Sequence, residues 1–120
     1  MKSTFRAYWR EDGIRVNTAT DTSLETVQDW EQDALTTVAA YEGQQKRLYD
    51  LRQLKRISIY ALRSAIKIKA HPNARLARVA VVANNAVVVR MVNVALSVQP
   101  GGHFRLFTDE ATAVGWLHNQ

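Results

Sequence analysis

Residues 48–62 read LYDLRQLKRISIYAL, a short apolar run with one carboxylate that passes through a basic turn into a helical pattern. Ser58 can cap that helix, and Ile57 and Leu62 on either side of it are spaced to form a hydrophobic staple. In an open α/β domain, the junction between a strand end and a helix start is where ligands and regulatory groups usually lie. We therefore expect this stretch to organise the fold and to be the place to look for function.

Before this stretch the chain predicts a hairpin and a helix. Residues 5–10 and 14–18 alternate in character around an Asp12-Gly13 turn, which favours two antiparallel strands. We expect the outer face of this hairpin to carry Arg6, Arg10, Arg15 and Asn17. A helix then begins at a capping box, residues 22–25, and ends at Gly43. Its predicted apolar stripe is Val27, Trp30, Ala34, Val38 and Tyr41.

After the 48–62 stretch, strands and helices alternate. The helix that starts at Ser58 is predicted to pack through Ile59, Leu62, Ala65 and Ile66 and to end before Pro72. Residues 78–83 are apolar on both faces, as is typical of a central strand. Residues 86–98 are rich in valine, yet the polar Arg90, Asn93 and Ser97 share one helical stripe, so we predict a buried amphipathic helix. Residues 104–107 form the last predicted strand, and Thr108 caps a final helix that packs through Ala113, Val114, Trp116 and Leu117.

The resulting order is a β-hairpin followed by α, β, α, β, α, β, α. Such alternation predicts an α/β fold with right-handed crossovers and a mixed, mostly parallel sheet. At 120 residues, the chain is expected to form a single domain, residues 1–120.

Charge is distributed unevenly along the chain. Residues 1–45 hold 4 basic and 8 acidic side chains, whereas residues 46–78 hold 10 basic and 1 acidic. This pattern fits two neighbouring elements that neutralise each other, or a basic patch for an anionic partner, and we favour the first. The chain has no cysteine and no apolar run long enough for a signal peptide or a membrane span, so we expect a cytoplasmic protein without membrane partners. We also expect no nucleic-acid partner, because the acidic helix is expected to lie beside the basic one.

The element order resembles that of the STAS family, the anti-sigma factor antagonists and their SpoIIAA-like relatives, many of them functionally unassigned bacterial proteins. The resemblance is carried by residues 48–51, by residues 78–83 with Arg90-Met91 in the following helix, and by residues 104–117. It implies a SpoIIAA-like βα superhelix and a regulatory or binding role. In typical members, a loop with Asp-Ser-Ser/Thr-Gly carries a phosphorylated serine. This chain has Ser58-Ile59-Tyr60-Ala61 there, so the acceptor position falls on Ile59 and the glycine is missing. The resemblance therefore implies a module without this phospho-switch, with Ser58 as a helix cap.

Few residues suggest catalysis. His71, His103 and His118 are far apart in the sequence, and no nucleotide-binding or nucleophile motif is present, so we expect no metal and no cofactor. Asp50 is the best acid–base candidate because it lies near a strand end, but an ion pair with Arg47 or Arg52 is the favoured interpretation. A possible anion site at the carboxyl edge of the sheet would combine Asp50, Arg52, Lys55, Arg56, Ser58, Asn84 and Asn85.

These observations favour a non-enzymatic regulatory or protein-binding module. The alternative is a small anionic-ligand-binding protein or enzyme, and a deep apolar cavity with Asp50 in its wall would support that alternative. We also expect a homodimer. The central strand is apolar on both faces, crossover helices cover only one face, and a second copy is the commonest way to bury the other.

Overall fold

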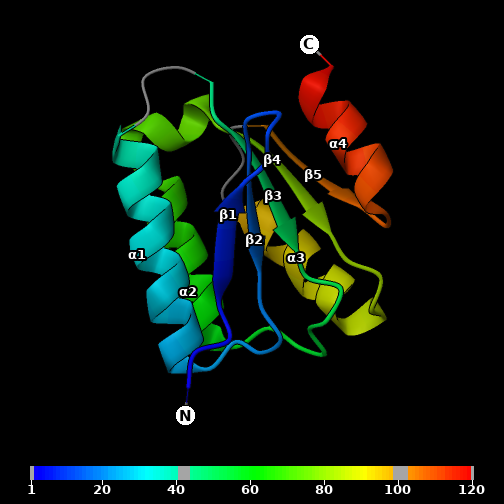
Figure 1. Cartoon of the computed structure of the whole chain (residues 1–120). Coiled ribbons are helices and arrows are strands. Elements are labelled where there is room, and N and C mark those ends of the chain that lie inside the picture. Colours follow the sequence, from blue (N-terminus) through cyan, green and yellow to red (C-terminus); the bar gives the residue numbers. More distant parts are fainter. Residues whose placement is uncertain (1, 41–43, 99–102, 120) are drawn as a thin grey trace.

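A single mixed sheet forms the centre of the computed structural model, which describes residues 2–40, 44–98 and 103–119 (Figure 1). The elements follow the predicted order. They are β1 (Arg6–Trp9), β2 (Ile14–Thr18), α1 (Leu24–Ala40), β3 (Lys46–Asp50), α2 (Ile59–Lys69), the 3-10 helix η1 (Pro72–Leu76), β4 (Arg78–Val82), α3 (Ala86–Val98), β5 (His103–Phe107) and α4 (Glu110–His118). The predicted helix end at Gly43 and the side chain of Tyr41 lie outside the described residues.

The strands lie in sequence order, β1-β2-β3-β4-β5. β1 and β2 are antiparallel, and each later pair is parallel. Gly13 makes the hairpin possible because its φ of 86° is a conformation that other residues avoid. The carboxyl ends of β2, β3 and β4 meet at one edge, where Asp50 is paired with Thr18 on one side and Val82 on the other. The predicted α/β fold, with its hairpin and mostly parallel sheet, is confirmed.

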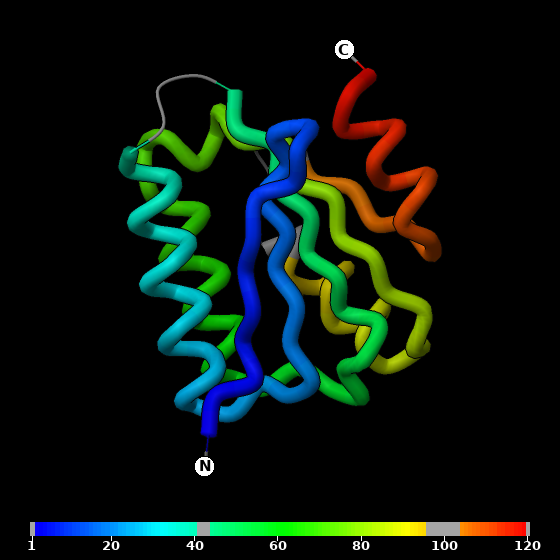
Figure 2. The backbone as a smooth tube through the Cα atoms, in the orientation of Figure 1, coloured from blue at the N-terminus to red at the C-terminus, as the bar shows by residue number. Residues whose placement is uncertain are grey.

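Helices cover both faces of the sheet. The crossover helices α1, α2 and α3 lie on one face, and α4 returns across the other (Figures 1 and 2). On the α4 face, Ala113 and Leu117 are fully buried against a core of strand residues. That core consists of Ile14, Val16, Leu48, Ala80 and Val82. The dimer expectation rested on an uncovered second face, and α4 removes that reason.

The crossover face has its own core, in which Val79 and Val81 pack with Val88 and Val92 of α3. The predicted helix at residues 86–98 is confirmed. It is only partly buried, because Val87 and Val94 are 53% and 54% exposed. Arg90 and Asn93 lie at its surface as predicted, while the Ser97 side chain is outside what the structure describes.

The predicted packing face of α2 was partly wrong. Ile59 and Ile66 are 57% and 41% exposed, and the buried residues are instead Ala61, Ser64 and Ile68. Apolar side chains surround most of this helix, so periodicity alone did not identify the face that α1 covers. The final helix also begins one residue later than predicted: Asp109, not Thr108, is its N-cap, with Oδ1 accepting the Thr112 N–H at 2.8 Å.

The predicted outer face of the hairpin was wrong at two positions. Asn17 is 4% exposed and Arg15 is only partly exposed, because α1 packs over this part of β2. Arg6 is exposed as predicted, and Arg10 is partly exposed and pairs with Asp12 at 3.1 Å.

Candidate functional site

Asp50 and Arg52 form a bidentate ion pair at the end of β3. Arg52 donates from Nε to Oδ1 of Asp50 at 2.9 Å and from Nη2 to Oδ2 at 2.8 Å, and its backbone N–H reaches Oδ1 at 3.1 Å. The guanidinium hydrogen bonds lower the pKa of Asp50 and keep the carboxylate ionised, although partial burial opposes the shift. Both carboxylate oxygens are thus engaged, and the predicted ion pair is confirmed with Arg52 rather than Arg47.

Arg52 lies in a negative environment. Asp109 and Glu110, at the start of α4, act on the same guanidinium as Asp50, and together these carboxylates raise the pKa of Arg52. A bound anion at Arg52 would therefore meet charges of its own sign.

Ser58 is confirmed as the N-cap of α2. Its hydroxyl oxygen accepts the Ala61 N–H at 3.3 Å and donates to the Thr22 carbonyl at 2.6 Å. The Ser58 N–H in turn donates to Oγ1 of Thr22 at 2.8 Å. The two bonds to Thr22 hold the start of α2 against the segment that leads into α1. The Ser58 hydroxyl is used both as a donor, to Thr22, and as an acceptor, from Ala61.

The remaining residues of the predicted anion site have separate positions. Asn85 caps α3 because its Oδ1 accepts the N–H groups of Val87 at 2.9 Å and Val88 at 3.3 Å. Asn84, Lys55 and Arg56 are exposed. Of the predicted anion site, the structure thus brings together only Asp50 and Arg52, at the end of β3. Ser58 caps α2 and Asn85 caps α3, each at the start of its own helix. Capping at both helix starts leaves fewer backbone N–H groups for an anion.

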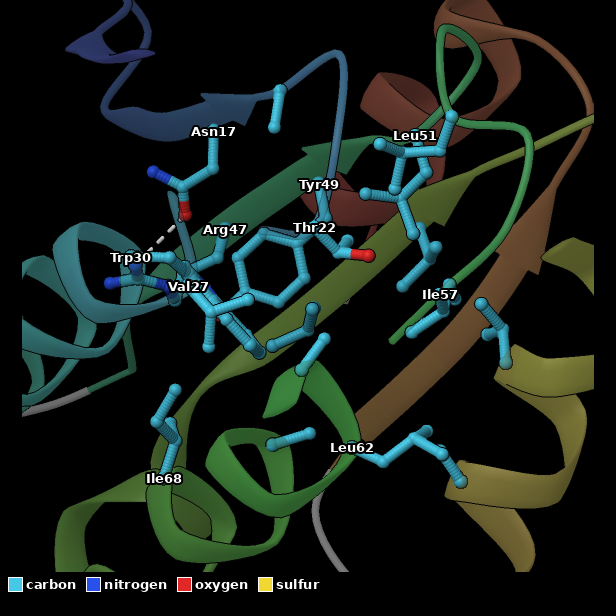
Figure 3. Close-up of a pocket in the computed structure, with 18 of the residues that line it drawn as sticks. Asn17, Thr22, Val27, Trp30, Arg47, Tyr49, Leu51, Ile57, Leu62 and Ile68 are labelled. Carbon is cyan, nitrogen blue, oxygen red and sulfur yellow. Dashed lines mark hydrogen bonds between the residues drawn. The ribbon is translucent and has the colours of Figure 1, made fainter. Parts of the chain in front are cut away.

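A cavity of about 150 Å³ lies on the crossover face, between the sheet and the helices (Figure 3). Tyr49 and Leu51 line it, but Asp50 between them does not, because successive strand residues point to opposite faces. Polar atoms contribute almost none of its wall. The cavity that would have favoured chemistry at Asp50 is therefore present, but without Asp50.

A buried polar cluster beside this cavity was missed by the sequence analysis. Arg47 is 1% exposed and donates to Thr37 at 2.6 Å, to Gln45 at 2.8 Å and to Asn17 at 3.1 Å. Its Nη2 lies 3.7 Å from Oδ2 of Asp33, which also pairs with Arg15. The available signal was the strand alternation, which places Arg47 on the face opposite Leu48, where the acidic helix crosses.

Two ion pairs join the acidic helix α1 to the basic part of the chain. Glu31 of α1 lies 3.6 Å from Nζ of Lys67 in α2 and accepts a hydrogen bond from Ser64 at 3.2 Å. With the Asp33–Arg47 pair, these contacts agree in part with the interpretation that we favoured for the charge pattern, while Lys55, Arg56 and Arg63 are exposed.

Apolar side chains are exposed where α1 and α2 begin. Leu24 is 43%, Ile59 57% and Tyr60 45% exposed, and the bonds between Ser58 and Thr22 bring the two helix starts together. We call these three residues the helix-start patch. Exposed cations precede and follow it in the chain: Lys55, Arg56 and Arg63.

Within the ranges that the structure describes, no helix is both long enough and apolar enough to cross a lipid bilayer. Within the same ranges, no three His, Asp or Glu side chains come together as metal ligands would.

Comparison with known proteins identifies the relatives of this arrangement. A family model described as SpoIIAA-like matches residues 14–118. A structure of an anti-sigma factor antagonist from Mycobacterium paratuberculosis aligns with a TM-score of 0.72 and 16% identity, covering 97% of this chain and 94% of that one. An uncharacterised DUF3478 protein with a SpoIIAA-like fold from Shewanella loihica aligns with a TM-score of 0.69 and 20% identity, covering 94% and 91%. Among curated proteins, no sequence matches the chain significantly.

Proposed function

The chain belongs to the SpoIIAA-like family, and we propose that it acts as a regulatory module that binds another protein, catalyses no reaction and has no phospho-switch at the start of α2. The anti-sigma factor antagonist with the same fold supports a regulatory role. The observation that carries the proposal is the pair Ser58 and Ile59. Ile59 occupies the acceptor position and has no hydroxyl, and the Ser58 hydroxyl is already bonded to Thr22 and Ala61.

The helix-start patch supports protein binding at this place. Leu24, Ile59 and Tyr60 expose apolar surface at one end of the α1–α2 pair, and exposed Lys and Arg side chains are close to them in the chain. Apolar residues with a charged rim are the usual composition of a protein interface. The expected partner therefore presents an apolar knob or groove bordered by Asp and Glu.

Two experiments test this proposal. In the first, this chain is used to capture proteins from an extract of the native host, and the captured proteins are identified. The dissociation constant of a purified captured protein is then measured for the wild-type chain and for the variants Ile59→Glu and Leu76→Glu. Leu76 is a matched control, because it is 44% exposed but lies in η1, beyond the other end of α2. We expect Ile59→Glu to weaken binding at least about tenfold and Leu76→Glu to leave it unchanged. Equal affinities for all three would rule out the helix-start patch.

The second experiment addresses phosphorylation. The protein is incubated with host extract and ATP and analysed by mass spectrometry, with the M. paratuberculosis anti-sigma factor antagonist treated in parallel in its own extract. We expect no phosphate on Ser58 or Tyr60. Stoichiometric phosphate on Ser58 would contradict the loss of the switch.

A small anion at the carboxyl edge of the sheet is the second candidate. It is favoured by a shallow hollow of about 390 Å³ at the end of β2, which has a mixed polar and apolar wall and is lined by Lys2, Arg6, Thr18, Thr20 and Gln53, among others. Of the predicted site, Lys55 and Arg56 would supply exposed charge. Ser58 is close to them in the chain, Asn84 and Asn85 lie at the start of α3, and Arg52 is held by Asp50. Titration with inorganic phosphate, followed by amide NMR shifts, tests this. Saturable shifts at residues 52–58 or in the hollow would support it, and linear, salt-like shifts would contradict it.

Self-association is the remaining proposal about partners. Tyr8 and Trp9 are 51% and 48% exposed on β1, an edge strand of the sheet. An edge strand offers unpaired backbone groups to another strand, and exposed aromatic residues add apolar area to such a contact. A second copy of the chain, joined along β1, is the homodimer that these residues support.

A further inference from the structure

The cavity on the crossover face has the features of a binding site that the regulatory role does not explain. We propose that it binds a compact, uncharged apolar molecule, the size of a single aromatic ring or a short branched alkyl group. The aromatic residues Trp30, Tyr49 and Phe104 line it, together with small residues of the helices, among them Ala65 and Ala95.

The chemistry of the wall selects an uncharged ligand. The polar side chains in the lining are Asn17, Thr18, Asp21, Thr22, Thr26, Arg47 and Lys69. Asn17 and Arg47 are bonded to each other at 3.1 Å (Figure 3), and Arg47 is bonded further to Thr37 and Gln45. Asp21 accepts from the Thr26 hydroxyl at 2.7 Å, the Thr22 hydroxyl accepts from the Ser58 N–H at 2.8 Å, and the Lys69 ammonium lies 4.7 Å from the centroid of the Phe104 ring. Almost no polar atom faces the interior. A ligand that brought a charge or a hydroxyl into this space would lose its water without gaining a hydrogen bond.

The volume of the cavity fixes the size of the ligand. An engineered cavity of about 150 Å³ with Leu, Ile and Phe walls stays empty of water and binds benzene, and the cavity of this protein has about the same volume. Part of the wall is already rigid, because Trp30 and Tyr49 pack edge to face with their centroids 5.8 Å apart. Little ordering is then required when a ligand enters, and a site of this kind would give the module a chemical input without phosphorylation.

Benzene is the probe that tests the proposal on the full chain. We expect it to raise the melting temperature and to shift the NMR signals of Tyr49, Val81 and Val92, saturably, with a dissociation constant on the order of 1 mM. Phenol, which adds a hydroxyl to the same ring, should bind at least about tenfold more weakly. Absence of saturable shifts at these residues, or equal affinity for benzene and phenol, would overturn the proposal.

Filling variants separate the cavity from nonspecific apolar contact. Ala65→Leu enters it from α2 and Ala95→Leu from α3, and each should melt at or above the wild-type temperature while binding benzene at least about tenfold more weakly. Ala111→Leu is the matched control, because Ala111 is exposed on α4 at the opposite face of the sheet, and its benzene affinity should equal that of the wild type. A folded filling variant that still binds benzene like the wild type would refute the assignment. If one variant does not fold, the other decides.

Discussion

Ser58 and Thr22 are joined by two hydrogen bonds in opposite directions, from the Ser58 hydroxyl to the Thr22 carbonyl at 2.6 Å and from the Ser58 N–H to the Thr22 hydroxyl at 2.8 Å. The same Ser58 oxygen caps α2 through the Ala61 N–H. The Ser58 side chain is thus part of the packing between two helix starts.

Removing the Ser58 hydroxyl should destabilise the fold. Ser58→Ala loses both the cap and the bond to Thr22, so we expect the free energy of unfolding to fall by about 1–2 kcal/mol in urea denaturation. Ser58→Asp keeps an acceptor for the cap but cannot donate to Thr22, and should recover part of the loss. Thr20→Ala, at an exposed position, is the control and should change stability by less than about 0.5 kcal/mol. A Ser58→Ala protein as stable as the wild type would show that the cap contributes nothing.

The ion pair of Asp50 and Arg52 should make stability depend on pH in a defined direction. The pKa of Asp50 is lowered from its ordinary value of 3.8, mainly by the hydrogen bonds from Arg52. A carboxylate with a lowered folded-state pKa stabilises the protein above the ordinary value, and this stabilisation is lost as the pH falls through the folded-state pKa.

Asp50→Asn should therefore be less stable than the wild type at pH 7 and should approach it in stability near about pH 2. Urea denaturation at both pH values measures the difference. Asp29→Asn, at an exposed position of α1, controls for the general loss of one negative charge. A difference between wild type and Asp50→Asn that is the same at both pH values would contradict the assigned shift.

Arg47 should be among the most sensitive positions of the chain. It is 1% exposed, and its removal would leave Asn17, Gln45 and Asp33 without their shared partner. We expect Arg47→Ala to lower the free energy of unfolding by about 3–5 kcal/mol, because polar groups that lose a buried charged partner stay desolvated. Arg63→Ala removes an exposed cation of α2 and should cost less than about 0.5 kcal/mol. Similar losses in both variants would mean that the Arg47 cluster is not a buried network in solution.

Local patterns were sufficient for the elements of this fold. Ser58 was recognisable as a cap from its neighbours in the sequence, and the stripe with Arg90 and Asn93 distinguished a helix from a strand in a valine-rich segment. The pairing of Asp50 with Arg52 was predictable because only two residues separate them along the chain.

The predictions that were wrong concerned the burial of side chains, which depends on the face of a strand or helix that another element covers. The alternation of residue types along β2 correctly placed the side chains of Val16 and Asn17 on opposite faces of the sheet. It did not indicate that α1 covers the face to which Asn17 belongs. The same uncertainty affected Ile59 and Ile66, which are exposed. A cavity is harder still to predict. It arises where the side chains of several helices and strands together do not fill the space between them, and no local sequence pattern indicates this.

The covering of the second sheet face by α4 changes where a dimer contact should be sought. Ala113 and Leu117 already bury that face, so a dimer cannot depend on it. Among the described residues, two other exposed apolar surfaces suit a contact between two copies: the β1 edge, with Tyr8 and Trp9, and the outer side of α3, with Val87 and Val94. We favour β1, because antiparallel pairing of two β1 strands around a twofold axis satisfies backbone groups as well as burying aromatic rings.

Light scattering at tens of micromolar should accordingly give twice the chain mass of 13.6 kDa. Trp9→Lys should shift the measured mass to that of one chain, since a cation on an edge strand opposes pairing. Val94→Lys puts the same charge on α3, where the wild-type side chain is 54% exposed, and should leave the dimer intact. If Val94→Lys alone dissociates the dimer, the contact is through α3. A wild-type mass of 13.6 kDa would instead show that the aromatic residues of β1 are available to a different partner.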